Sequence, residues 1–96
     1  MAIETDTYAQ QGAGVTPHID IKDSNQIAIA YQVSVSGTVN YTVEHSLDAI
    51  DYIANDDATS QTAAIDGNYI LPVRAVRLRV NSGTGTATLI VRQLVV

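Results

Sequence analysis

The chain has no cysteine, tryptophan or phenylalanine, and only five of its 96 residues are Lys or Arg. Without cysteine, neither a disulfide nor a thiolate metal site can form, and a domain this small often gains stability by oligomerising. Ten acidic residues give a formal net charge of −5. That charge argues against nucleic-acid binding, which needs a basic surface. No apolar run approaches the length of about 18 residues that would cross a membrane.

The N-terminal stretch Met1 to Asp6 has neither the basic start nor the apolar core of a secretion signal. We therefore expect a protein that is made and used without secretion. Residues 1–16 are small and polar, with Gly12 and Gly14 near their end. They are interpreted as an extended N-terminal arm, with a frayed terminus as the alternative.

Residues that favour β-strands dominate the remaining chain, residues 17–96. The hydrophobic fraction of the whole chain is 46%, and Val, Ile and Thr are common. β-branched side chains pack well on pleated sheets. Apolar side chains alternate with polar ones in several short segments, and no strand–helix–strand pattern appears. The prediction is one all-β domain, an antiparallel β-sandwich of about six to eight strands, jelly-roll-like or immunoglobulin-like.

The alternation suggests which strands form hairpins. Residues 27–35 and 39–45 both place apolar side chains on odd positions, so a three-residue loop ending at Gly37 would pair Val33 with Val39. Alternatively, these two strands lie in opposite sheets and do not pair. A second hairpin, turning at Gly83, would pair Leu78 with Leu89. Over 46–58 we expect a connection with at most a short helix, followed by a weak strand over 59–65 and a turn at 66–68. A long strand should then run over 69–80, and Pro72 restricts it to a sheet edge or a bulge.

Signatures of catalysis and cofactor binding are nearly absent, so we expect no enzyme and no cofactor. His18 and Asp20 share a strand face but are read as ordinary surface residues, and His45 as a cap on the core. The acidic residues between 44 and 57 suggest a solvated loop more strongly than a calcium site, because the EF-hand spacing is missing. A deep pocket lined by His45, Asp48 and Asp51 would favour an enzyme instead.

Two features are candidates for binding partners. Arg77, Arg79 and Arg92 would share one outward face of the last predicted hairpin, and guanidinium groups suit carboxylates of another protein or another copy. The apolar end of the chain, Leu94, Val95 and Val96, would dock on a neighbour or complete its own sheet.

Three segments resemble sequences of known proteins. Residues 35–48 are VSGTVNYTVEHSLD, residues 67–78 are GNYILPVRAVRL, and residues 83–89 are GTGTATL. Over roughly residues 27–93 the chain resembles small virion structural proteins of tailed bacteriophages. The resemblance implies a β-sandwich or jelly-roll cement (decoration) protein on the capsid surface. Such a protein would be made in the host cytoplasm and would stabilise the phage head by bridging major capsid subunits, as a dimer or trimer.

Two alternatives to the capsid role remain at this point. One is a tail, neck or head-fibre component of the virion. The other is a carbohydrate-binding adhesion module, which would expose Tyr8 or Tyr52 to a sugar.

Overall fold

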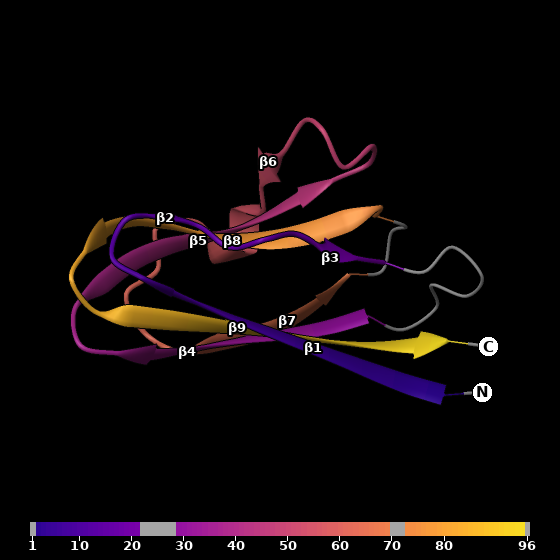
Figure 1. Cartoon of the computed structure of the whole chain (residues 1–96), viewed down its shortest axis with the longest axis horizontal. Helices are drawn as coiled ribbons and strands as arrows, with labels where there is room; N and C mark the ends of the chain where they lie inside the picture. The colour runs from indigo at the N-terminus through magenta and orange to yellow at the C-terminus, as the bar shows by residue number, and fades with distance from the viewer. Residues whose placement is uncertain (1, 22–28, 70–72, 96) are drawn as a thin grey trace.

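The chain folds as a sandwich of two antiparallel β-sheets packed face to face (Figure 1). The structure is a computed structural model that describes residues 2–21, 29–69 and 73–95. The predicted all-β sandwich is therefore confirmed. Nine strands lie within these residues, more than the six to eight expected, because three of them have only two residues.

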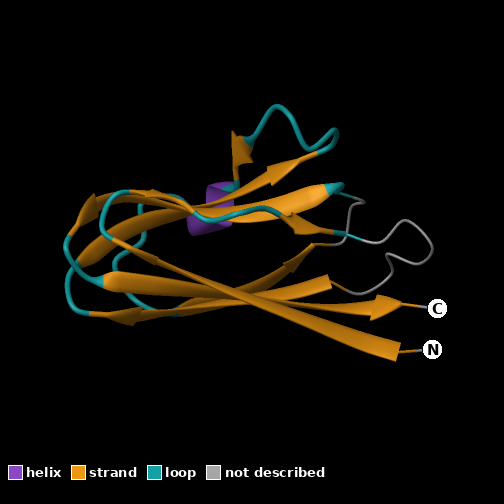
Figure 2. Cartoon of the chain, viewed as in Figure 1, coloured by secondary structure: helices purple, strands orange, loops and turns teal. Residues whose placement is uncertain are grey.

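The first sheet has the strand order β1-β9-β4-β7. Its strands are β1 (Ala2–Gln11), β9 (Thr86–Val95), β4 (Ile29–Ser36) and β7 (Ile65–Tyr69). The second sheet has the order β2-β8-β5-β6, and β3 also pairs with β8. Its strands are β2 (Gly14–Val15), β8 (Ala75–Gly83), β5 (Val39–Ser46), β6 (Ile53–Ala54) and β3 (Ile19–Asp20). A single turn of 3-10 helix, η1 (Asp56–Ala58), follows β6 (Figure 2).

The core lies between the two sheets and is built from the alternating apolar positions of the four long inner strands. Each of these strands turns every second side chain inward, as a strand with one buried face does. The buried positions are Ile29, Tyr31, Val33, Val39, Tyr41, Val43, Val76, Leu78, Val80, Ala87, Leu89 and Val91. The alternation therefore indicates correctly which side chains are buried.

The strand partners differ from the predicted hairpins. β4 pairs with β9 and β7, whereas β5 pairs with β8 and β6. Both hairpin predictions are wrong, and the alternative that places residues 27–35 and 39–45 in opposite sheets is confirmed. Apolar side chains that face inward are buried equally well whether their two strands pair in one sheet or lie in opposite sheets. Alternation alone therefore cannot show which strands pair.

Glycines make the sharp corners where the chain passes from one sheet to the other. Gly37, between β4 and β5, has φ +80°, and Gly83, at the end of β8, has φ +104°. Both values lie in the left-handed region that a side chain disfavours. A Cβ on Gly85 would collide with the Ser36 carbonyl oxygen. The chain therefore does turn at Gly37, as predicted, but the turn connects the two sheets.

Two other local predictions fail for identifiable reasons. Residues 66–68 were expected to turn, but they lie within β7. Gly67 is needed there because a Cβ would meet the Tyr31 ring of the neighbouring strand at 2.6 Å. The long strand expected over 69–80 is two strands: β7 ends at Tyr69, and β8 begins at Ala75. The expectation for Pro72 lies outside the described residues.

The segment expected to be an N-terminal arm is extended, and it is paired with the sandwich. β1 runs antiparallel to β9 from the pair Ala2↔Val95 to the pair Gln11↔Thr86, and β2 pairs with β8. Leu94 and Val95 belong to β9 and so complete their own sheet. Within the described part of the chain, no helix is long and apolar enough to cross a membrane.

Candidate partner-binding surface

A loop of residues 47–52 projects from the second sheet between β5 and β6 (Figure 1). Three large apolar side chains on it or beside it face solvent: Leu47 is 75% exposed, Ile50 78% and Ile53 67%. We call residues 47–53 the projecting loop. Exposed apolar side chains that gather on one protrusion are typical of sites that bind other molecules.

A network of hydrogen bonds around Asp48 fixes the base of this loop. Asp48 Oδ1 accepts from Ser46 Oγ at 2.8 Å and from the backbone N–H groups of Ile50 and Asp51, each at 2.9 Å. These bonds, led by the one from Asp51, lower the pKa of the Asp48 carboxyl. Ala49 lies between the hydrogen-bonded residues Asp48 and Ile50, and its φ of +62° is unusual for a residue with a side chain. The loop therefore presents its apolar side chains in a defined shape.

Tyr52 fastens the far end of the loop to β8. The Arg77 guanidinium carbon lies 3.8 Å from the centre of the Tyr52 ring, which is the geometry of a cation–π contact. Burial raises the pKa of the Tyr52 hydroxyl. One face of the Tyr52 ring is therefore covered by an arginine and is not open to a sugar.

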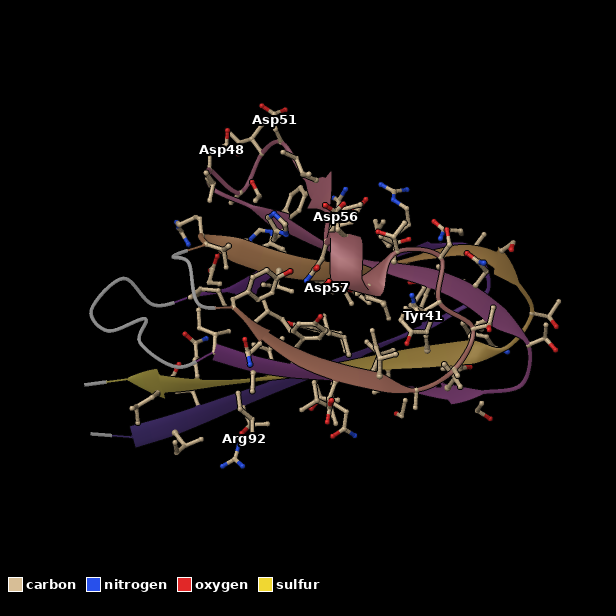
Figure 3. The ribbon with its side chains drawn as sticks, turned by 180° about the vertical axis from the view of Figure 1, so that it is seen from behind. Tyr41, Asp48, Asp51, Asp56, Asp57 and Arg92 are labelled. Atoms are coloured by element: carbon tan, nitrogen blue, oxygen red, sulfur yellow. The ribbon has the colours of Figure 1, made fainter. Side chains whose placement is uncertain are left out.

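An open cavity of about 660 Å³ lies beside the projecting loop. Its lining includes His45, Asp48 and Asp51, the three residues whose gathering would favour an enzyme, together with Asn55, Asp56 and Asp57. In Figure 3, Asp48 and Asp51 lie on the projecting loop, and Asp56 and Asp57 lie at the 3-10 helix. The rim is therefore acidic, and apolar side chains stand next to it.

The floor of the cavity is a fixed polar network. His45 Nδ1 lies 3.2 Å from Tyr69 Oη, and the Asn55 side-chain N–H group donates to the same oxygen at 3.1 Å. Asn55 also donates to Tyr31 Oη at 3.3 Å, and its own oxygen accepts from the Asp57 N–H at the start of η1. Burial raises the pKa of Tyr69 to about 12, although the Asn55 hydrogen bond opposes that shift. Tyr69 is therefore a neutral hydroxyl near pH 7.

The polar groups beside the cavity bond to one another. Ser46 Oγ donates to Asp48 Oδ1, and His45 Nδ1 lies against the Tyr69 hydroxyl. Among the described residues, no three His, Asp or Glu side chains form a cluster that could hold a metal ion. His18 Nε2 lies 3.2 Å from Asp20 Oδ1, and Arg74 contacts the same oxygen at 3.1 Å.

The three arginines expected on one face are divided between the two sheets. Arg77 and Arg79 lie on β8 and contact the two oxygens of Glu44 on β5, at 2.7 Å and 3.0 Å. Arg92 lies on β9 and is exposed on the outside of the other sheet (Figure 3). The prediction of a common face is wrong because β8 and β9 do not form a hairpin. A role for these arginines in binding a partner stays a prediction.

The apolar end of the chain has a similar outcome. Leu94 is half-buried, and β9 carries Leu94 and Val95 alongside β1. Val96 lies outside the described residues. Their expected docking on a neighbour also stays a prediction.

Comparison with known proteins gives no family. No family model matches the chain, and no curated protein sequence matches it. Two solved structures are similar in shape. A chain from the disulfide-linked pili of Bacillus endospore appendages has a TM-score of 0.47 and 16% identity, covering 98% of this chain and 89% of its own. The Yersinia pseudotuberculosis-derived mitogen has a TM-score of 0.44 and 11% identity, covering 97% and 86%. Neither likeness bears on function.

Sequence reasoning missed the exposed apolar residues of the projecting loop. Leu47, Ile50 and Ile53 are three residues apart, which suggests one face of a helical turn and hence burial. The signal against a helix is the Ser46–Asp48 pair, because a serine and an aspartate two residues apart favour a local turn over a helix. The cavity floor could not be found at all, since Asn55 and Tyr69 meet only through the strand order.

Proposed function

We propose that the chain is a virion structural protein, a capsid cement protein that stabilises a phage head by bridging major capsid subunits. The observation that carries this proposal is the projecting loop, on which Leu47, Ile50 and Ile53 remain exposed in a hydrogen-bonded shape. The resemblance of residues 27–93 to small tailed-phage virion proteins supports the same class.

The chemistry of the loop indicates the partner surface. Apolar side chains on a rigid protrusion fit a depression, and a preformed shape lowers the entropy lost on binding. The carboxylates of Asp48, Asp51, Asp56 and Asp57 line the same cavity as Leu47 and Ile53, so the depression should have Lys or Arg on its rim. A protein that binds only the assembled lattice stabilises that lattice by mass action.

The test uses particles that lack this chain, to which purified protein is added back. We expect the wild-type chain to bind and to raise the resistance of the particles to heat and osmotic shock. The Leu47→Ser/Ile50→Ser variant should fold but fail to do either. The matched control is Val15→Thr, which alters a 39%-exposed apolar residue away from the loop. Particles that are equally resistant with and without the wild-type chain would rule the proposal out.

The carbohydrate-binding alternative has one supporting feature. Tyr8, which is 38% exposed, lines a cavity of about 190 Å³ with Asp6, His18 and Asp20. An exposed aromatic ring beside carboxylates is a common way to hold a sugar. A glycan array on which the wild-type chain and Tyr8→Ala both give no signal would remove this alternative. An image of the assembled particle would separate a capsid location from a tail, neck or head-fibre location.

A further inference from the structure

β1 is a long edge strand with one unpaired side. It pairs with β9 along its whole length, and within the described residues no strand pairs with its other edge. The other edge strands are much shorter: β7 has five residues, and β2, β3 and β6 have two each. Short edges are one way in which proteins prevent sheets from adding to one another. β1 lacks that protection.

Proline, lysine and a bulge, three further protective devices, are also missing from β1. Its sequence, AIETDTYAQQ, has Glu4 and Asp6 as its charged residues, and its register with β9 continues without interruption. The side chains from Ile3 to Gln11 are exposed or half-buried, with Ile3 54% exposed. Within the described residues, no strand has to be displaced for a second strand to pair with this edge.

We infer that β1 pairs with β1 of a second copy of this chain, antiparallel about a two-fold axis. The pairing joins two four-stranded sheets into one continuous sheet of eight. Backbone hydrogen bonds along the open edge supply the attraction, as in other cases of β-strand addition. This inference does not rest on the capsid role, because it concerns the purified chain alone.

The charges on β1 select the register. In an antiparallel strand, every second residue directs both its N–H and its C=O to the same edge, so only residues of equal parity can face each other. A two-fold axis at Asp6 would place two Asp6 carboxylates opposite each other. An axis at Thr5 would place Glu4 opposite Asp6, and like charges in such positions destabilise a sheet.

An axis at Thr7 avoids these repulsions and keeps the most pairs. It places Thr7 opposite Thr7 of the second copy, Asp6 opposite Tyr8, and Glu4 opposite Gln10. Both carboxylates then face side chains that can donate a hydrogen bond. An axis at Tyr8 also avoids repulsion, but it leaves Ile3 beyond the end of the paired region.

The native lack of cysteine permits a direct test of this register. Residues that face each other in antiparallel strands have Cα atoms about 4.5–5.5 Å apart, within the range that a disulfide bridges. Under mild oxidation, Thr7→Cys should therefore form a covalent dimer with itself. Thr5→Cys is the matched control, because it would face Ala9 and should stay monomeric.

A charge test complements the crosslink. Gln10→Lys should tighten dimerisation measured by sedimentation, on the order of fivefold, since each introduced ammonium group faces Glu4 of the other copy across the axis. Gln10→Glu should weaken it by a similar factor. Gln32→Lys and Gln32→Glu make the same charge changes on β4 and should have no effect.

Three results would overturn the inference. The first is a wild-type chain that stays monomeric at every concentration, together with Thr7→Cys that does not crosslink. The second is crosslinking of Thr5→Cys as readily as Thr7→Cys. The third is growth into open chains in place of dimers, which would indicate pairing of β1 with β7. None of these outcomes concerns capsid binding, which is measured on particles.

Discussion

Arg77 on β8 and Glu44 on β5 face each other in the register of the second sheet, and Arg77 Nε donates to Glu44 Oε1 at 2.7 Å. Arg79 Nε donates to the other oxygen at 3.0 Å, so one carboxylate lies between two guanidinium groups. The Glu44 side chain is only 12% exposed. These arginines therefore stabilise the sheet itself.

The first prediction follows from this arrangement. Arg77→Ala should lower the free energy of unfolding by about 2 kcal/mol, because the buried Glu44 carboxylate loses a charged partner and Tyr52 loses its cation. Arg79→Ala should cost less than about 1 kcal/mol, since Arg79 is 43% exposed. Urea denaturation measures both, and Arg92→Ala is the exposed control. Equal losses for Arg77 and Arg92 would contradict the prediction.

The second prediction concerns the corner between β8 and β9. Gly83→Ala should destabilise the fold by more than about 2 kcal/mol, because the methyl group meets the Thr38 carbonyl oxygen and the left-handed backbone is strained. Gly12→Ala is the control: its φ is also positive, at +70°, but nothing lies within 4 Å of the added Cβ. It should cost only the backbone strain, about 1 kcal/mol. Comparing the thermal unfolding of the two variants should separate the cost of the contact with Thr38 from the cost of the backbone strain.

The third prediction is a loss of stability at alkaline pH. Burial raises the pKa of Tyr41 and of Tyr69 to about 12, against 10.0 for a free tyrosine. The folded state favours the neutral form of both tyrosines, so their contribution to stability is fully present below pH 10. It is lost as the pH rises toward 12, because the unfolded chain ionises first. The urea midpoint should fall over this interval as tyrosinate absorbance appears. Tyr69→Phe should reduce the slope, whereas Tyr8→Phe, at an exposed ring, should leave it unchanged.

The fourth prediction concerns the shape of the projecting loop at acid pH. The pKa of Asp48 is lowered from 3.8, first by the Asp51 backbone hydrogen bond and then by that from Ile50. The carboxylate therefore orders the loop above pH 3.8, and the order is lost as the pH falls through the lowered pKa. The amide resonances of Ile50 and Asp51 should shift in that range by NMR. Asp48→Asn should weaken the same bonds at neutral pH.

Asp51→Asn is the matched control for this loop. It removes an equal charge, but the bond to Asp48 comes from the Asp51 backbone, which the substitution keeps. Unchanged amide resonances in Asp48→Asn would mean that other contacts hold the loop.

The buried residues could be predicted from the sequence, and their partners could not. Alternation places Val33, Val43, Leu78 and Leu89 inside without any knowledge of the fold. Each of these side chains fits a neighbour in the same sheet or in the opposite one. The glycines at positions 37 and 83 mark sharp turns in either case.

The binding surfaces were harder to predict because they depend on the strand order. The acidic residues between 44 and 57 are evident in the sequence, but the exposure of Ile50 follows from a turn that Asp48 imposes on the backbone. The open edge of β1 has no signature of its own, since any strand can be central or peripheral. The strand order also places Arg92 and Arg77 in different sheets.

The pairing of β1 with β9 has a consequence for synthesis on the ribosome. β1 is made before its partner β9, so it waits unpaired while the intervening chain is translated. During that wait, the β9 of a completed copy nearby is chemically identical to its own. A high local concentration of newly made copies should therefore favour exchange of this strand between them.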